Sequence, residues 1–179
     1  MGEAHILVLG GQRSGKSRFA EDLVAGSGKL RVYVATAARR DGEMAERIAE
    51  HRARRGPDWT TIEEPLELPS VLGQVAEEST AILVDCLTLW LSNLFEAKRD
   101  IEKEMEALLL VLSARNAPVV LVSGEVGLGV IPLNQLARAY ADALGTLNQR
   151  VATVAGRVVF MAAGQPLLVK PSASPEIAL

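Results

Sequence analysis

Five short apolar runs, rich in β-branched residues, recur along the 179-residue chain, and segments with helical spacing of apolar residues separate them. The runs are HILVLG (5–10), RVYVAT (31–36), AILVDC (81–86), PVVLVS (118–123) and RVVFMA (157–162). Continuous apolar runs of this length are typical of strands that are buried on both faces of a sheet. Because helices connect consecutive parallel strands, we predict an α/β fold with a mainly parallel sheet flanked by helices on both faces.

The same periodicity predicts the other elements. Helices are expected at 16–26, 42–55, 68–78, 87–113 with a break at 96–100, and 133–154. TTIEEP (60–65) predicts one more short strand, and PLLVK (166–170) predicts an edge strand that can run antiparallel. The turn-rich segment 171–179 is expected to be a mobile tail. Because no linker interrupts the pattern, residues 1–179 are expected to form a single domain.

The composition excludes several classes of protein. The net charge of −3 argues against a general nucleic-acid binder. The single cysteine, Cys86, excludes an intrachain disulfide and a zinc site built from several thiolates, and its place after an apolar run predicts buried packing. No apolar run approaches the roughly 20 residues that cross a bilayer, and a strand follows the amino terminus without a basic leader. We therefore expect a soluble cytoplasmic protein with no membrane span and no nucleic-acid partner.

The segment GGQRSGKS (10–17) matches the phosphate-binding loop pattern: Gly10, four residues, then Gly15-Lys16-Ser17. It follows an apolar strand and opens a helix, where backbone N–H groups and the helix dipole hold phosphate oxygens. Lys16 is expected to reach the β and γ phosphates, and the Ser17 hydroxyl to bind Mg²⁺. The candidate nucleotide-binding residues of this loop are Gly10, Gly11, Gln12, Arg13, Ser14, Gly15, Lys16 and Ser17.

An acidic residue at the end of a buried strand completes such a site. Asp85 closes AILVD, where its carboxylate fits a contact to Mg²⁺, direct or through water; a strand-end cap is the alternative. Because the chain also carries a phosphate loop, we favour the contact to Mg²⁺ over the strand-end cap. These features predict a P-loop NTPase-like domain with a Mg-nucleotide site, but they leave kinases, ATPases, GTPases and nucleotide sensors open. The chain has no Asn-Lys-x-Asp segment of the kind that selects guanine in GTPases.

Two further segments bear on function. GEVGLGVIP (124–132) carries Glu125 in a glycine-rich turn, which predicts either a ligand-facing loop or a plain strand-to-helix connection. ERIAEHRARRG (46–56) places His51 among four arginines, on a helical stripe shared with Ile48 and Met44. Taken alone, a histidine on such a stripe is more often a packed residue than a reactive one.

Six segments occur together in an order that resembles one enzyme family. They are LGGQRSGKSRFAE, VYVATA, DGEMAERIAEHRARRGPDWTTIEEP, LVDCLTLWLSNL, EVGLGVIPLNQLAR and LGTLNQRVA. The chain resembles the bifunctional adenosylcobinamide kinase / adenosylcobinamide-phosphate guanylyltransferase family of cobalamin biosynthesis, from Ile6 to about Lys170. This combination of motifs is far more specific than the phosphate loop alone.

The resemblance implies two reactions and a covalent intermediate. Adenosylcobinamide would be phosphorylated by ATP or GTP, and GMP would then pass from GTP to adenosylcobinamide phosphate, giving adenosylcobinamide-GDP. His51 would carry the guanylyl group between these partners, and the protein would be a homotrimer. The residues that the resemblance places around GTP are Gly10 to Ser17, Ala35, Thr36, Arg52, Arg54, Arg55, Glu63 and Asp85.

The sequence departs from the family pattern at two positions. Gly124 stands where an asparagine is usual, so an amide is lost beside an expected substrate loop. Ala141 stands where an arginine is common. We expect contacts to the corrinoid or between subunits to differ from those of the family, and the phosphate chemistry to be retained.

The chemistry of nucleotidyl transfer is compatible with His51. A neutral imidazole has a free nitrogen lone pair near pH 7, because its unperturbed pKa is about 6.5. Neighbouring arginines disfavour the imidazolium and stabilise charge on the phosphates. If the helix starts near Gly42, however, His51 lies roughly 14 Å along its axis, away from the expected ligand edge of the sheet. Either this helix crosses the site or it moves when GTP binds.

The residues alone are also compatible with two other functions. One is a small-molecule kinase that uses only the phosphate loop, with His51 as a structural residue. The other is a nucleotide-switched regulatory module that binds a nucleotide but barely turns it over. Corrinoid-dependent consumption of GTP supports the bifunctional enzyme, phosphate transfer without nucleotidyl transfer supports the kinase, and tight nucleotide binding without either reaction supports the regulatory module.

Overall fold

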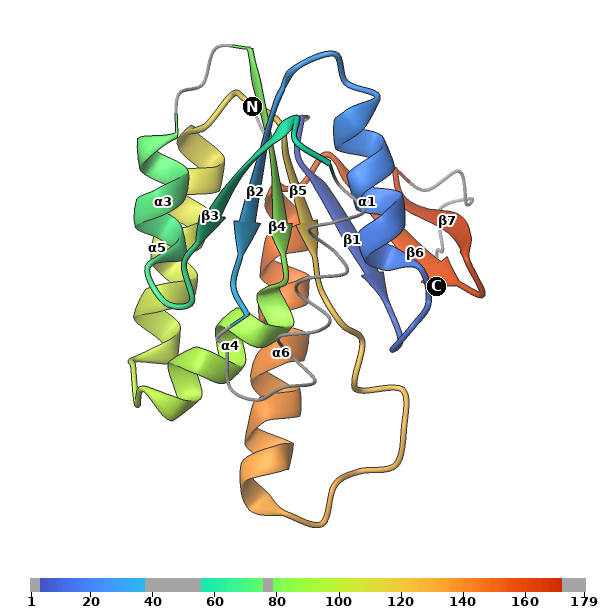
Figure 1. The fold of residues 1–179 in the computed structure, drawn as a ribbon. Coiled ribbons are helices and arrows are strands. Elements are labelled where there is room, and N and C mark those ends of the chain that lie inside the picture. The colour runs from blue at the N-terminus through green and yellow to red at the C-terminus, as the bar shows by residue number, and fades with distance from the viewer. Residues whose placement is uncertain (1–3, 38–55, 76–78, 172–179) are drawn as a thin grey trace.

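A computed structural model describes residues 4–37, 56–75 and 79–171 of the chain. Seven strands form one sheet in the order β3-β2-β4-β5-β1-β6-β7 (Figure 1). They are β1 (Ile6–Gly10), β2 (Leu30–Ala35), β3 (Trp59–Glu63), β4 (Thr80–Asp85), β5 (Val119–Val122), β6 (Arg157–Ala162) and β7 (Gln165–Lys170). Strands β1 to β6 pair in parallel, and β7 pairs with β6 in antiparallel orientation. The predicted parallel sheet, the extra strand β3 and the antiparallel edge strand are confirmed.

Each helix in the described ranges overlaps a predicted one. They are α1 (Lys16–Ala25), α3 (Leu68–Gln74), α4 (Leu87–Glu96), α5 (Ile101–Ala114) and α6 (Gln135–Val154). The predicted break separates α4 from α5, and the Asp100 side chain caps α5 by accepting the Lys103 N–H. The predicted helix 42–55 and the predicted tail from 172 onward lie outside the described residues. Within the described ranges, no helix has the length and apolar character needed to cross a membrane.

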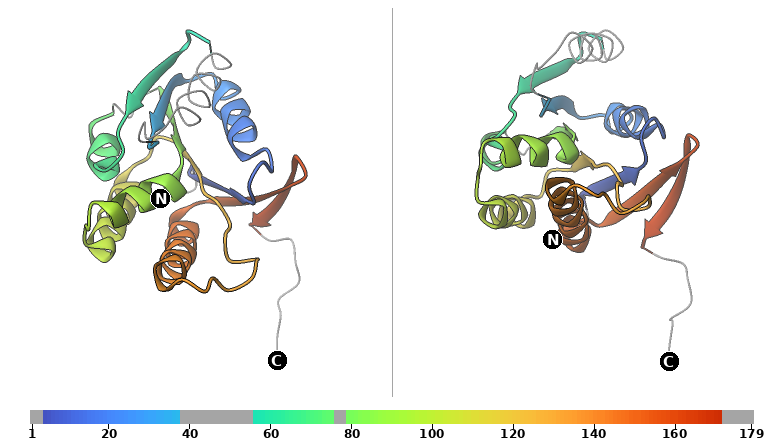
Figure 2. Two further views of the ribbon diagram at one scale, coloured as in Figure 1. Left: turned by 60° about the horizontal axis from the view of Figure 1, so that its bottom comes forward. Right: turned by 90° about the horizontal axis from the view of Figure 1, so that it is seen from below.

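Alternating side chains of the strands pack on opposite faces of the sheet. On β1, Leu7 joins a core cluster with residues of α3, α4, α5 and α6, whereas its neighbour Val8 joins a second cluster with Ala20 and Val24 of α1. Figures 1 and 2 show α1 on one face and these four helices on the other. Successive strand side chains point to opposite faces, so two apolar layers require an apolar residue at every position. This confirms helices on both faces and explains the continuous apolar runs.

Candidate nucleotide-binding site

The carboxyl ends of the parallel strands meet at one edge of the sheet. Ala35 ends β2 and is in register with Glu63 at the end of β3 and with Asp85 at the end of β4. Gly10 ends β1, which is separated from β4 by β5 alone. The fold thus places predicted site residues from four strands along the edge where open α/β sheets bind ligands.

The phosphate loop begins at a position that only glycine can occupy. Gly10 has φ +149°, and a Cβ there would lie 2.6 Å from the carbonyl oxygen of Met161 and 2.8 Å from Ser14 Oγ. The Gly10 carbonyl also accepts a hydrogen bond from the backbone N–H of Glu125 at 3.0 Å. The turn after β5 is therefore fastened beside the start of the loop.

The loop leads into the amino-terminal end of α1, where anion-binding groups remain available. Gly15 is the N-cap residue, with φ 97°, and no side chain caps the helix. Uncapped N–H groups at a helix start bind phosphate oxygens. Ser14 Oγ is buried and has no hydrogen-bond partner among the described residues. Because an unpaired buried hydroxyl is unfavourable, this atom fits a site that a phosphate oxygen completes.

Lys16 lies half-buried within the same loop. Its Nζ donates a hydrogen bond to the carbonyl oxygen of Gly11 at 2.6 Å. Burial lowers the pKa of the Lys16 ammonium below its usual range, and the nearby Cys86 and Asp85 side chains oppose this shift. A bound phosphate would supply the negative charge that a half-buried cation lacks. The structure therefore fits the predicted role of Lys16 in holding phosphates.

Asp85 and Ser17 are the residues that would hold Mg²⁺. Asp85 ends β4, and its Oδ2 accepts a hydrogen bond from the Tyr33 hydroxyl at 3.2 Å. Ser17 is in the first turn of α1. In the described part of the chain, no three His, Cys, Asp or Glu side chains gather into a metal site. The Asp85 carboxylate and the Ser17 hydroxyl are oxygen ligands of the kind that fit Mg²⁺, which takes one or two protein oxygens together with phosphate oxygens and water.

We expect Asp85→Asn to raise the Mg²⁺ concentration needed for half-maximal nucleotide turnover by about tenfold, because a neutral amide binds a hard cation or its waters less well. A magnesium titration of turnover checks this. Asp58→Asn is the matched control, since Asp58 is exposed at the other end of the sheet, where it pairs with Arg31 at 3.7 Å. An unchanged titration in Asp85→Asn would remove Asp85 from the metal site.

Thr36 follows β2 and is held by four hydrogen bonds. Its hydroxyl donates to the carbonyl oxygen of Cys86 at 2.7 Å and accepts the Cys86 N–H at 2.8 Å. Its backbone N–H donates to the Asp85 carbonyl at 3.3 Å, and its carbonyl accepts from Asn93 Nδ2 at 2.7 Å. Because Thr36 is fully buried, its side chain braces the turn beside the site.

Four residues predicted for the site lie outside the described residues: His51, Arg52, Arg54 and Arg55. The other histidine, His5, is buried before β1, at the opposite edge of the sheet, where its Nε2 contacts the Leu112 carbonyl at 2.8 Å. Burial is the main cause that lowers the pKa of His5 below its usual value. Its place in the fold excludes His5 from the nucleotide site.

Cys86 carries a thiol, a possible nucleophile, and lies near Lys16. It is partly buried and packs against the core cluster on the α1 face, in keeping with the predicted packing role. Burial is the main cause that raises the pKa of its thiol to about 11. Because the thiolate is the reactive form, Cys86 is a poor nucleophile at neutral pH.

Three residues that the sequence did not single out hold the turn at Gly124. The Gly124 N–H donates to Thr88 Oγ1 at 2.6 Å, and Asn148 Nδ2 donates to the Gly124 carbonyl at 3.1 Å. The Tyr140 hydroxyl donates to the Thr88 carbonyl at 2.8 Å. A polar Asn148 on the buried stripe of α6 was the one signal available in the sequence.

Beyond this turn, residues 126–134 and the first two residues of α6 form an exposed apolar arm (Figure 1). Its exposed apolar residues are Val126, Leu128, Val130, Ile131, Leu133 and Leu136. Arg138 of α6 holds the arm by donating to the carbonyl oxygens of Pro132 and Leu133. A pocket of ≈ 200 Å³ lies between the arm and α6, and Ala141 lines it. The second departure from the family pattern therefore falls on the surface next to the arm.

The sheet topology and the phosphate loop define a nucleotide-binding protein of the P-loop NTPase class. In fold, the chain is similar to the flagellar accessory protein FlaH from Methanocaldococcus jannaschii, with a TM-score of 0.55 and 10% identity over 94% of this chain and 78% of that one. It is also similar to an ATPase of the type III secretion system of pathogenic bacteria, with a TM-score of 0.53 and 10% identity over 88% of this chain and 51% of that one. These similarities show the fold alone.

Sequence relatives define the family. The chain belongs to the cobinamide kinase / cobinamide phosphate guanyltransferase family, whose sequence profile matches residues 6–169. It is 51% identical over 166 residues to the bifunctional adenosylcobalamin biosynthesis protein CobP of Pseudomonas aeruginosa, covering 92% of this chain and 96% of the relative. It is 36% identical over 180 residues to the bifunctional protein CobU of Salmonella typhimurium, covering 92% and 99%. The resemblance seen in the motifs is confirmed, and the chain is a transferase of this family.

Proposed function

We propose that this chain carries out both reactions of its family: phosphorylation of adenosylcobinamide by ATP or GTP, then transfer of GMP from GTP to the new phosphate. The observation that carries the proposal is the convergence of the phosphate loop, Glu63 and Asp85 at one edge of the sheet. A phosphate loop alone serves many reactions. Membership of the family favours these two.

In the kinase step, the hydroxyl oxygen of adenosylcobinamide attacks the γ-phosphorus. The bond from that phosphorus to the β–γ bridging oxygen breaks, the nucleoside diphosphate leaves, and the hydroxyl proton passes to solvent. Such a reaction depends mainly on positioning and on stabilising charge. The backbone N–H groups at the start of α1 and the Lys16 ammonium would supply both. Mg²⁺, held by Ser17 and Asp85, would neutralise part of the phosphate charge.

In the guanylyl-transfer step, a ring nitrogen of His51 attacks the α-phosphorus of GTP. A nitrogen–phosphorus bond forms, the bond to the α–β bridging oxygen breaks, and pyrophosphate leaves. A phosphate oxygen of adenosylcobinamide phosphate then attacks the same phosphorus, which releases His51 and forms adenosylcobinamide-GDP. We assign Arg52, Arg54 and Arg55 to the stabilisation of phosphate charge during both displacements.

The proposed biological unit is a cytoplasmic homotrimer. The apolar arm supports an assembly of several copies, because monomeric proteins rarely expose so many neighbouring apolar side chains. Val130 and Leu133 of the arm are 96% and 98% exposed. Sedimentation equilibrium of the full chain tests the number of subunits: a trimeric mass supports the proposal, and a monomeric mass at micromolar concentration contradicts it.

Incubation of the protein with adenosylcobinamide, Mg²⁺ and GTP, followed by identification of the corrinoid products, tests the proposed function. Adenosylcobinamide phosphate should appear first and adenosylcobinamide-GDP second. A phosphorylated corrinoid with no GDP derivative would indicate a kinase that lacks nucleotidyl transfer. Tight nucleotide binding with no corrinoid product would indicate a regulatory module.

We expect Gly124→Asn to change the KM for the corrinoid about threefold or more and to leave GTP affinity unchanged, because Gly124 itself hydrogen-bonds to Thr88 and Asn148 and not to the phosphate loop. A Cβ at Gly124 would lie 3.0 Å from Thr88 Oγ1, so Thr88 must shift slightly. Gly124→Ala is the matched control, since it adds the Cβ without the amide. Steady-state kinetics and GTP titration check the expectation, which fails if GTP affinity changes while corrinoid kinetics stay constant.

A further inference from the structure

Asn93 of α4 bridges two turns at the candidate nucleotide site. The side chain is 5% exposed, and its Nδ2 donates to the carbonyl oxygen of Thr36 at 2.7 Å and to that of Pro65 at 2.9 Å. Both hydrogens of one amide are thus used, each on a different turn. A buried amide in this arrangement fixes the distance between the two chain segments that it joins.

The two turns leave neighbouring strands immediately after the last paired residues. Ala35 of β2 and Glu63 of β3 are in register, and the Glu64 N–H donates to the Ala35 carbonyl at 2.9 Å. Thr36 and Pro65 lie just beyond this last backbone bond. Asn93 therefore joins the two turns by hydrogen bonds just beyond the point where backbone pairing between β2 and β3 ends.

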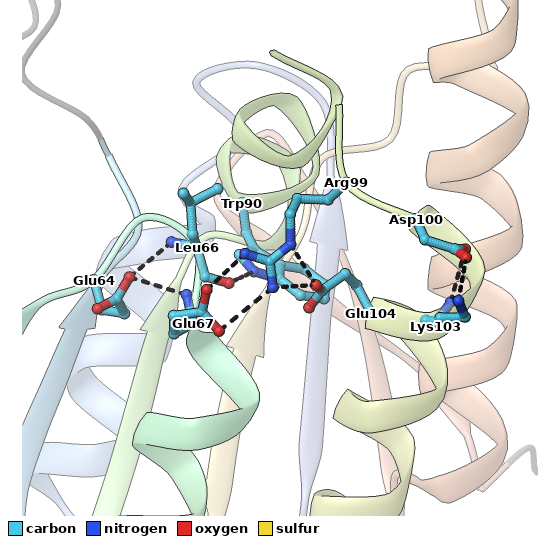
Figure 3. A network of polar contacts seen from close by, with 8 residues as sticks. All are labelled: Glu64, Leu66, Glu67, Trp90, Arg99, Asp100, Lys103 and Glu104. Carbon is cyan, nitrogen blue, oxygen red and sulfur yellow. Dashed lines mark hydrogen bonds and ion pairs between the residues drawn. The ribbon is translucent and has the colours of Figure 1, made fainter. Parts of the chain in front are cut away.

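The outer part of the β3 turn is fastened independently of Asn93. Glu64 Oε1 accepts the N–H groups of Leu66 and Glu67, each at 2.9 Å, and Trp90 Nε1 donates to the Leu66 carbonyl at 2.8 Å. Arg99 then pairs with Glu67 at 2.7 Å, as Figure 3 shows. With so many other contacts, loss of Asn93 should change the spacing of the turns and leave the loop folded.

We propose that Asn93 is a positioning residue that sets the preference for GTP over ATP by holding Glu63 at a fixed distance from the β2 turn. This inference rests on the proposed function, in which Glu63 lies with the phosphate loop at the nucleotide-binding edge of the sheet. Guanine presents two adjacent N–H donors, at N1 and N2, whereas adenine presents an acceptor at N1 and only a C–H at the matching C2. A carboxylate such as that of Glu63 accepts hydrogen bonds and so matches guanine. Such discrimination depends on placement to within about 0.5 Å.

The test measures equilibrium binding of GTP, ATP and inorganic triphosphate to Asn93→Leu, which keeps the volume and removes both donors. We expect the ratio of GTP to ATP affinity to fall about tenfold, because a misplaced acceptor loses a hydrogen bond to the base. Inorganic triphosphate, which has no base, should bind as tightly as it does to the unmodified protein. Equal losses for all three ligands would mean that Asn93 supports the fold in general, and they would overturn the proposal.

Two further variants keep the test decisive. Asn93→Ser, whose short side chain cannot reach both carbonyls, should show the same loss of preference if the leucine variant does not fold. Asn148→Leu is the matched control, because Asn148 is also a buried amide that donates to a turn carbonyl, but at Gly124. It should keep the GTP to ATP ratio, and a tenfold loss there would overturn the assignment to Asn93.

A double-mutant cycle with Glu63→Gln separates this inference from the proposed function. If Asn93 acts through the position of Glu63, the double variant should lose no more preference than Glu63→Gln alone. Additive losses would overturn the positioning role. If Glu63→Gln binds GTP and ATP as the unmodified protein does, the assignment of Glu63 to the GTP site fails. If Glu63→Gln loses the preference and Asn93→Leu keeps it, only the positioning inference fails.

Discussion

Lys16→Ala is expected to lower the rates of both corrinoid phosphorylation and guanylyl transfer by about 10²–10³-fold, the size of effect seen when one preorganised charge contact is removed. In the structure, the Lys16 ammonium is half-buried in the phosphate loop and donates to the Gly11 carbonyl at 2.6 Å. It is therefore held beside the N–H groups at the start of α1, which we propose bind the phosphates. Steady-state assays of the two corrinoid products measure the loss.

An exposed lysine provides the control for this variant. Lys29 is exposed in the turn between α1 and β2, at the edge of the sheet opposite the phosphate loop. Lys29→Ala should keep both activities and should show that loss of a positive charge alone has no effect. Full retention of both activities in Lys16→Ala would contradict the assignment of the nucleotide site to this loop.

His51→Ala is expected to lower guanylyl transfer by at least about 10³-fold and to keep part of the kinase activity, because removal of a covalent nucleophile abolishes the steps that pass through it. Phosphorylation needs the loop and Mg²⁺ but no covalent intermediate. Corrinoid product analysis measures both activities in one reaction mixture. The phosphorylated corrinoid should therefore accumulate without its GDP derivative.

Cys86→Ser is the control for the identity of the nucleophile. The pKa of the Cys86 thiol, raised to about 11 mainly by burial, leaves it protonated at neutral pH. This variant should therefore keep guanylyl transfer. If His51→Ala keeps guanylyl transfer at the level of the unmodified protein, His51 is a packed helix residue and the covalent mechanism is wrong.

The fold and the phosphate-loop part of the candidate site were predictable because they depend on local sequence patterns. The five apolar runs predict strands buried on both faces, and the structure pairs them in one sheet. The glycine spacing of 10–17 predicts a phosphate loop, and the contacts at Gly10 show why no side chain fits there. Asp85 closes its strand in the sequence pattern, whereas Glu63 is assigned through the family resemblance; parallel pairing then brings both residues to the same edge.

Contacts between distant segments were not predictable in the same way. Asn93 lies in the mainly apolar helix α4, and nothing local indicates that its amide reaches Thr36, 57 positions earlier. The same applies to Thr88, which meets Gly124 through the packing of α4 against the end of β5. A polar residue on a buried helical stripe is a general signal for such a contact, but it does not name the partner.

The apolar arm shows a different limit. Its sequence predicts a glycine-rich turn because Gly127 and Gly129 dominate the pattern. The structure extends it to residue 136 and exposes six apolar side chains along it. Local turn chemistry predicts where the chain bends, whereas the exposure of these side chains depends on what packs against them.

The central claim is that His51 carries the guanylyl group, and labelling of the unmodified protein tests it most directly. Incubated with Mg²⁺ and GTP labelled in the α phosphate, the protein should retain label that is lost in acid and stable in base, as expected of a phosphoramidate. GTP labelled in the γ phosphate should leave no label, and peptide mapping should place the α label on His51. Retention of the γ label, or an α label on any other residue, would contradict the account.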